Sequence, residues 1–199
     1  MNKIVLTLIV LLLSIVLLAE ERTINDSYNF EARSDFQNAL SVMNELSAKE
    51  PTDAFYRIRT AWLQYLLGSY TEAIQSYQQS IKLLDCLDAY TGIINCQLAL
   101  GNYSEAIRVA DSQLTIHKQN PTLLSKAAYA AYLKKDYTLA ASYYQRAIDL
   151  YPWDMETRGY LINNLYLAGQ TNEAKRQYQA LKKYSPMSPI ISTYKGILD

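Results

Sequence analysis

His117 is the only histidine among the 199 residues, and Cys86 and Cys96 are the only cysteines. Catalysis by a Ser-His-Asp or Cys-His group would have to use that one imidazole as its base. A zinc site needs about four ligands, which these three residues do not supply. The six glycines form neither a GxGxxG nor a GxxxxGK phosphate loop. We therefore expect a protein that is not an enzyme and that uses no metal or cofactor.

The charge balance argues against a nucleic acid partner. Nineteen Lys and Arg residues match nineteen Asp and Glu residues, and the pI is about 6.6. Proteins that bind nucleic acid carry a basic patch or an excess of positive charge. The partner is therefore expected to be something other than DNA or RNA.

The first 19 residues read as a targeting segment. After Lys3, residues 4–18 are apolar except for Thr7 and Ser14. This run is at the upper limit of a signal peptide and is shorter than the roughly 20 residues that cross a bilayer. Ala19 suits cleavage, but Leu17 replaces the preferred small residue two positions earlier. We expect export, with the chain periplasmic or secreted if residues 1–19 are cleaved. If they are retained, they anchor the chain to the membrane with the C-terminal domain outside the cytoplasm.

The elements that position any binding residues follow from a repeat. Similar segments of about nine residues recur five times, each centred on a short turn. Their equivalent turn residues are Ser34, Gly68, Gly101, Lys135 and Gly169, at intervals of 34, 33, 34 and 34 residues. A fixed period of this length is typical of a solenoid built from pairs of helices.

The repeat resembles the tetratricopeptide repeat (TPR) family, whose unit is a helix, a turn and a second helix. When the turn residue is numbered 15, position 20 is alanine in all five units: Ala39, Ala73, Ala106, Ala140 and Ala174. A methyl group there lets the two helices of one unit approach closely. The resemblance implies an all-α, right-handed superhelical solenoid.

The units are expected to fill most of the chain. Residues 20–186 form the array, in units of about 20–53, 54–86, 87–120, 121–154 and 155–188. Residues 189–199 place Ile190, Ile191, Tyr194, Ile197 and Leu198 on one helical stripe. This pattern predicts a C-terminal capping helix over the last unit. The same numbering places Cys86 and Cys96 near opposite ends of one helix, too far apart for a disulfide.

A stacked array presents the first helix of each unit on a concave surface. Positions 2, 5, 6, 9, 12 and 13 share that face, and they are rich in tyrosine, of which the chain has 18. Tyr, Trp and Arg often anchor interfaces. The candidate partner-binding residues are Arg59, Trp62, Tyr65, Asn95, Lys126, Tyr129, Tyr132, Asn163 and Tyr166. The competing interpretation is that these rings only pack against neighbouring helices.

These features predict a non-catalytic scaffold or adaptor that binds a protein or peptide in an aromatic groove, within a cell-envelope assembly. One alternative is an envelope protein that stacks a glycan or peptidoglycan strand on the same rings. Another is an accessory subunit of an envelope enzyme or secretion complex. The peptide-carboxylate clamp known in the family is not expected, because position 5 carries no cation in any unit.

Overall fold

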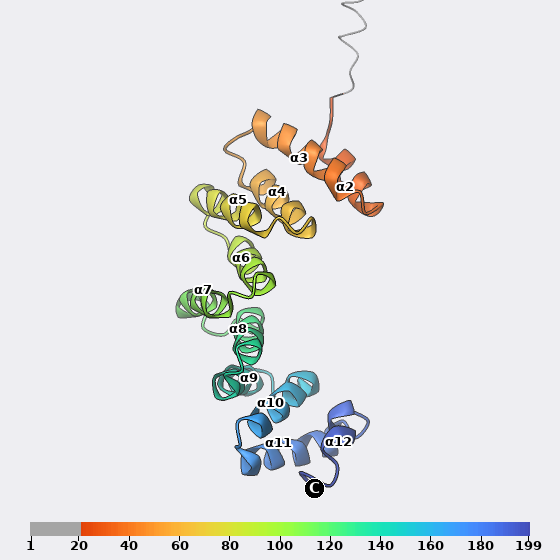
Figure 1. Cartoon of the computed structure of the whole chain (residues 1–199), viewed down its shortest axis with the longest axis vertical. Helices are drawn as coiled ribbons and strands as arrows, with labels where there is room; N and C mark the ends of the chain where they lie inside the picture. Colours follow the sequence, from red (N-terminus) through yellow and green to blue (C-terminus); the bar gives the residue numbers. More distant parts are fainter. Residues whose placement is uncertain (1–20) are drawn as a thin grey trace, which may run out of the picture.

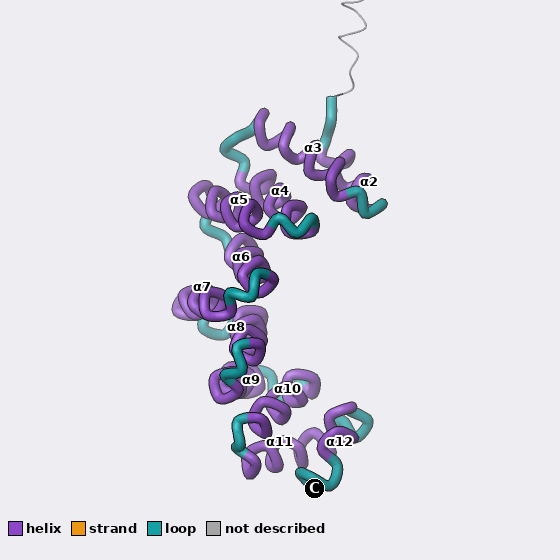
Figure 2. Tube along the Cα trace, in the orientation of Figure 1, coloured by secondary structure: helices purple, strands orange, loops and turns teal. Residues whose placement is uncertain are grey.

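The computed structural model describes residues 21–199, which form helices joined by short loops, with no strand among them (Figures 1 and 2). The eleven helices of this part are α2 Ile24–Ala32, α3 Phe36–Lys49, α4 Ala54–Leu66, α5 Tyr70–Leu83, α6 Leu87–Ala99, α7 Tyr103–Ile116, α8 Pro121–Leu133, α9 Tyr137–Leu150, α10 Met155–Leu167, α11 Thr171–Tyr184 and α12 Pro189–Tyr194. Each packs against the next along the chain. The predicted all-α solenoid is confirmed. The predicted signal or anchor, residues 1–19, lies outside the described residues.

The array curves so that its two ends bend toward the same side (Figure 1). Helices α6 and α8 lie on the inner side of the curve, and α7 lies on the outer side. The first helix of a pair therefore faces the hollow, as expected for a helical repeat. None of the helices between residues 21 and 199 combines the length and apolarity that a membrane span requires.

Side chains ahead of the helices define where several of them begin. Asp35, Asp53, Asn120, Asp136 and Asp154 each accept a hydrogen bond from a backbone N–H in the first turn that follows. These bonds satisfy amide groups that have no partner inside the helix. The short polar loops therefore set the helix boundaries as well as the connections.

Every predicted turn residue adopts a left-handed backbone conformation. The φ angles are 59° at Ser34, 79° at Gly68, 75° at Gly101, 65° at Lys135 and 74° at Gly169. In each case the next amide donates to a carbonyl five residues earlier, as Ser69 N does to Gln64 O at 2.9 Å. This is the Schellman ending of a helix, for which glycine is the favoured residue. Ser34 and Lys135 pay a steric cost that the glycines avoid.

Replacing Lys135 with glycine is expected to raise the free energy of unfolding. Relief of the left-handed strain is worth about 1–2 kcal/mol, and the extra freedom of glycine in the unfolded chain offsets part of it. The net gain is expected to be about 0.5–1 kcal/mol in urea unfolding followed by circular dichroism. Lys134, with φ of −72°, is the matched control. Lys134→Gly should instead lower the free energy of unfolding by about 0.5–1 kcal/mol. Equal changes in both variants would contradict the strain argument.

The small and large residues of the repeat pack as the spacing predicts. All five alanines at position 20 have no exposed surface. Position 24, one helical turn later, is also buried in every unit: Met43, Tyr77, Ala110, Tyr144 and Tyr178. Position 24 also reaches the next pair, since Tyr77 lies against Gly92 of α6 and Tyr144 against Tyr160 of α10. This part of the tyrosine excess therefore serves stability.

The predicted capping helix is shorter than the sequence pattern indicates. Helix α12 ends at Tyr194 instead of continuing to Asp199. Gly196 then adopts a φ of 78°, and the amides of Ile197 and Leu198 both donate to Tyr194 O. This turn buries Leu198 completely but leaves Ile197 half exposed. The cap is thus one short helix followed by a turn, because the left-handed glycine ends the helical stripe.

Candidate functional site

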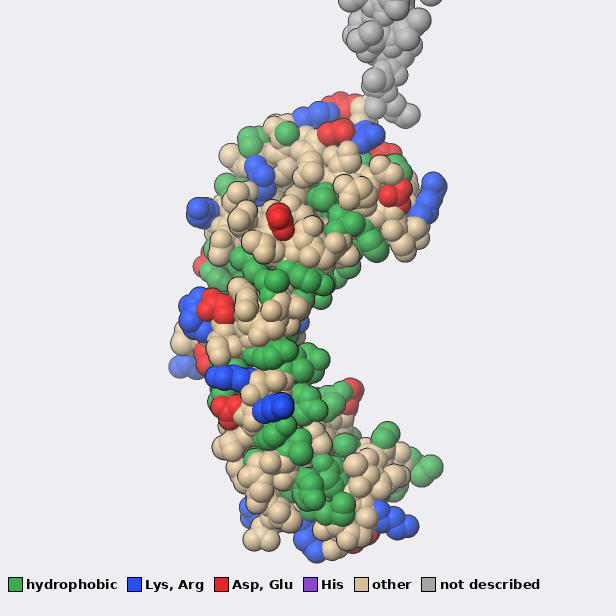
Figure 3. Space-filling model, viewed as in Figure 1, with side chains coloured by type: hydrophobic (Ala, Val, Ile, Leu, Met, Phe, Trp, Pro, Cys, Tyr) green, Lys and Arg blue, Asp and Glu red, His purple; other side chains and the backbone are tan. Residues whose placement is uncertain are grey.

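Apolar and aromatic side chains gather along the inner side of the curve (Figure 3). Tyr129 and Tyr132 of α8 and Tyr160 of α10 are 49%, 37% and 46% exposed. Large rings normally lose most of their exposed surface on folding, so a row of exposed rings on one face points to an interaction surface. The predicted partner-binding residues lie on the helices that form this face.

Several of those residues contact one another across neighbouring units. Position 6 of one unit meets position 9 of the unit before it. Lys126 Nζ donates to Asn95 Oδ1, and Tyr194 Oη donates to Asn163 Oδ1 at 2.7 Å. Arg59 lies over the ring of Tyr28, 5.1 Å from its centroid. The groove residues thus also hold successive first helices together, as the competing packing interpretation proposed.

Arg59 is neutralised at this inter-unit contact. Its guanidinium forms an ion pair with Glu31 on α2, and both side chains are only 18% exposed. The Tyr28 ring covers the same guanidinium. A cation that already has a carboxylate and an aromatic partner gains less from an external anion. Arg59 therefore has a mainly structural position in the first two units.

Lys126 is a different kind of cation. It is half-buried, and its hydrogen-bond partner is the amide oxygen of Asn95. Within residues 21–199, no carboxylate lies within 4.0 Å of its Nζ. Burial lowers the pKa of this ammonium group below its usual range. Lys126 therefore carries a charge that the described part of the chain does not balance.

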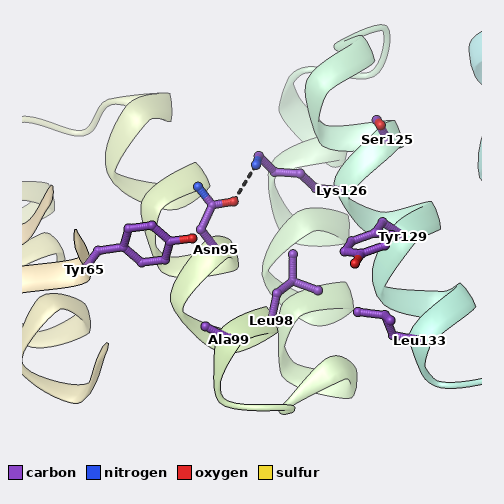
Figure 4. Close-up of a pocket in the computed structure, with 8 residues that line it drawn as sticks. All are labelled: Tyr65, Asn95, Leu98, Ala99, Ser125, Lys126, Tyr129 and Leu133. Atoms are coloured by element: carbon purple, nitrogen blue, oxygen red, sulfur yellow. Dashed lines mark hydrogen bonds between the residues drawn. The ribbon is translucent and has the colours of Figure 1, made fainter. Parts of the chain in front are cut away.

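A cavity of about 480 Å³ surrounds this charge (Figure 4). Tyr65 comes from α4, Asn95 from α6, and Lys126 and Tyr129 from α8, so the structure brings four of the nine predicted residues together. Figure 4 shows Lys126 reaching from α8 toward Asn95, with the Tyr65 hydroxyl pointing at the same amide. The other lining residues are Leu98, Ala99, Ser125 and Leu133.

Those four additional residues were absent from the predicted site, although a signal for them existed. They occupy positions 5, 12 and 13 of their units, on the same helical face as positions 6 and 9. The prediction favoured aromatic, amide and cationic side chains and passed over small and aliphatic ones. Leu98 and Leu133 supply the apolar surface of the cavity, which selection by residue type does not reveal.

The remaining aromatic candidates lie at different depths in the fold. Trp62 stacks on Tyr65, with ring centroids 5.6 Å apart and an interplanar angle of 19°. Tyr65 also contacts Tyr70, and burial raises the pKa of the Tyr65 hydroxyl. Tyr132 packs at 6.0 Å from Tyr137 but stays partly exposed. Tyr65 thus combines its ring contacts with a place in the cavity lining, whereas Trp62 is partly buried and does not line the cavity.

The capping segment covers the candidates of the last unit. Tyr194 of α12 donates to Asn163 and packs edge-on against Tyr166, with centroids 4.9 Å apart. Both residues belong to α10, away from the central cavity. The structure therefore separates Asn163 and Tyr166 from the cavity around Lys126.

The two cysteines lie apart from the cavity around Lys126. Cys86 and Cys96 are free thiols at the start and interior of α6. Burial raises the pKa of Cys96 to about 11, which keeps it protonated and unreactive at neutral pH. Across residues 21–199, no three His, Cys, Asp or Glu side chains lie close enough to share a metal ion.

Lys126→Met is expected to leave the free energy of unfolding unchanged at pH 7 or to raise it by up to about 1 kcal/mol, because it removes a desolvated charge. The pKa of Lys126 is lower in the folded than in the unfolded chain. At pH values between these two pKa values, the unfolded chain therefore binds more protons than the folded chain. The wild type therefore gains stability relative to the variant as pH rises through this window toward about 10.5. Urea unfolding of both proteins across that range is the measurement. A variant clearly less stable at pH 7 would show that Lys126 stabilises the fold.

Comparison with known proteins agrees with the fold. A profile of the tetratricopeptide repeat matches residues 28–92 and 95–154. MamA from Desulfovibrio magneticus RS-1 is similar in structure, with a TM-score of 0.70, 16% identity, and coverage of 83% of this chain and 94% of that one.

Two further structures show the same arrangement. A tetratricopeptide repeat protein from Parabacteroides merdae ATCC 43184 has a TM-score of 0.74 and 17% identity, covering 88% of this chain and 70% of that one. YrrB, described as a TPR protein with an unusual peptide-binding site, has a TM-score of 0.60 and 24% identity, with 72% and 75% covered. A search of curated proteins found no match. At these identities the structural likeness establishes the fold alone.

Proposed function

Because the chain belongs to the tetratricopeptide repeat family, whose arrays act as protein-protein interaction scaffolds, we propose that it binds a peptide or protein partner on its concave face as a non-catalytic scaffold or adaptor. The partner contacts the cavity between α4, α6 and α8. We further propose that the protein is exported and works in a cell-envelope assembly, on the basis of the apolar residues 4–18.

The observation that carries this proposal is the cavity around Lys126. It combines an ammonium group without a carboxylate partner in the described chain, the amide of Asn95, and the rings of Tyr65 and Tyr129. Partners are often anchored at interfaces by charged groups that lack an opposite charge and by rigid rings with a polar end. The peptide-binding site described for YrrB supports a peptide or a protein segment as the kind of ligand.

The test is affinity capture from the native membrane fraction with the tagged full chain. A Tyr65→Ala/Tyr129→Ala variant removes both rings of the cavity and is expected to lose the specific partner, because each interface anchor is worth about 2 kcal/mol. Phe55→Ala is the matched control, since Phe55 is a 47% exposed ring on α4 that does not line the cavity. The captured protein is then purified and its affinity measured with all three chains.

Two outcomes would contradict the binding proposal. If the double variant is folded by circular dichroism and binds with unchanged affinity, the cavity is not the binding site. If instead the wild type is retained on a polysaccharide column and the double variant is not, the aromatic face binds glycan rather than protein. The mass of the chain isolated from its native source tests export separately, because cleavage of residues 1–19 excludes the membrane anchor.

A further inference from the structure

Two further cavities adjoin the one around Lys126, toward the start of α8. A second cavity, of about 350 Å³, shares Ser125 and Lys126 with the first. A third, of about 540 Å³, shares Pro121, Tyr151 and Asp154 with the second. Because neighbouring cavities have lining residues in common, they lie side by side, and we call this row of three cavities the α8 path.

One face of helix α8 runs along the length of this path. Pro121, Ser125, Tyr129 and Leu133 recur at intervals of four residues, and each lines at least one of the three cavities. Figure 4 shows Ser125, Tyr129 and Leu133 in succession along the helix. The span from Pro121 to Leu133 is about 18 Å at 1.5 Å per residue. An extended peptide of about five or six residues covers that length.

The far end of the path is an exposed aromatic surface at the loop between α9 and α10. Trp153 is 71% exposed and Tyr151 is 49% exposed. Trp153 also packs edge-on against Tyr184 at the end of α11, with centroids 5.2 Å apart, which holds the indole in place. A fixed and exposed tryptophan is the residue most often found as an interface anchor.

The two ends of the α8 path differ in charge. Lys126 lies where the first and second cavities meet, and its charge has no carboxylate partner within residues 21–199. Asp154 lines the second and third cavities, and its carboxylate already accepts hydrogen bonds from Thr157 N and Oγ1. An acidic group is therefore attracted at Lys126 and repelled toward the Trp153 end.

We propose that the ligand is an extended segment of a partner protein that lies along the α8 path, with an Asp or Glu side chain at Lys126 and an apolar side chain on Trp153. This rests on the proposed function and adds the chemistry of the ligand. The five residues from Pro121 to Lys126 rise about 7.5 Å, so the acidic and apolar residues are separated by at least about two residues of extended chain. Trp153 is the specificity-determining residue outside the concave face.

The test uses a displayed library of random peptides of about twelve residues, long enough for the whole path, selected on the immobilised full chain. Selection on the wild type is expected to enrich peptides that contain an Asp or Glu and an aromatic or aliphatic residue. The spacing between these two residues should be constant, in either order. The affinity of the best peptide is then measured by fluorescence anisotropy. Trp153→Ala is expected to weaken binding about tenfold or more. Replacing the peptide's apolar residue by Ala should then have little additional effect on that variant.

Lys126→Met tests the other end of the path. It should weaken the acidic peptide about tenfold or more, and it should bind the acidic peptide and its Asn or Gln analogue equally. Ile116→Ala is the matched control, because Ile116 is a 68% exposed apolar residue outside the three cavities. That variant should bind as the wild type does, and thermal unfolding confirms that all the variants are folded.

The failures of the two proposals are distinguishable. If Trp153→Ala binds the selected peptide as tightly as the wild type, while Tyr65→Ala/Tyr129→Ala has lost it, the α8 path is wrong and the concave binding site stands. Enrichment of peptides without an acidic residue also overturns the α8 path. If every peptide that the wild type enriches is also enriched by the Tyr65→Ala/Tyr129→Ala variant, both proposals fail.

Discussion

Tyr178→Ala is expected to lower the free energy of unfolding by about 3–5 kcal/mol. Tyr178 is fully buried at position 24 of the last unit, and its hydroxyl donates to Ile191 O at 3.2 Å. The side chain therefore joins α11 to the capping segment and belongs to the hydrophobic core. Truncation creates a cavity and leaves the short α12 with less to pack against. Urea unfolding followed by circular dichroism measures the change.

Two substitutions serve as controls for Tyr178. Tyr178→Phe keeps the ring and removes one hydrogen bond, so it should cost only about 0.5–1.5 kcal/mol. Tyr184→Ala removes a 51% exposed tyrosine from the same helix and should cost only about 0.5–1.5 kcal/mol, because the edge-on contact with Trp153 is the packing that it loses. If Tyr184→Ala is as damaging as Tyr178→Ala, burial at position 24 is not the cause.

Gly92→Ala is expected to destabilise the fold by about 1–2 kcal/mol, although alanine is the better helix former. A Cβ at this position would lie 2.2 Å from Cζ of the Tyr77 ring, which is itself 3% exposed. Displacing a packed ring costs about 1–3 kcal/mol, and three ring atoms within 2.6 Å place this site in the upper part of that range, at about 2–3 kcal/mol. The gain in helix propensity of about 1 kcal/mol offsets part of that cost. Thermal and urea unfolding measure the net loss.

A double-mutant cycle tests the cause. Tyr77→Leu alone should destabilise the protein through lost packing, but Gly92→Ala added to it should cost little, because the ring that the methyl group meets is gone. A coupling energy of at least about 1 kcal/mol between positions 77 and 92 is expected. Additive losses in the double variant would show that Gly92 is required for some other reason.

The burial of Gly92 does not follow from its position in the repeat. Its position in the repeat places it on the concave face with Arg59 and Lys126, yet it is buried. The missing side chain makes room for a tyrosine from the preceding helix pair. A position number identifies the face of a helix, but the size of the neighbouring side chain decides whether that face is open.

Much of the fold was predictable because the relevant interactions are local and repeat. Each turn depends on one residue that tolerates positive φ, and each unit has a methyl group at position 20 and a buried side chain at position 24. Such features recur every 33 or 34 residues, so five weak signals reinforce one another. The cap was less predictable, because Gly196 ended a stripe of apolar residues that otherwise reads as one longer helix.

The sequence by itself determined the repeat, the all-α class, the alanine contacts and the helices that form the concave face, since these follow from spacing along one chain. The tertiary structure decided which candidates act as a site. It paired Arg59 with Glu31 and covered Asn163 with Tyr194, while leaving the Lys126 charge without a carboxylate among the described residues. It also placed the cavity beside that charge next to the one lined by Trp153. Such differences arise from contacts about 30 residues apart, where the identity of each partner, rather than the repeat position, determines whether a charge or a ring is satisfied.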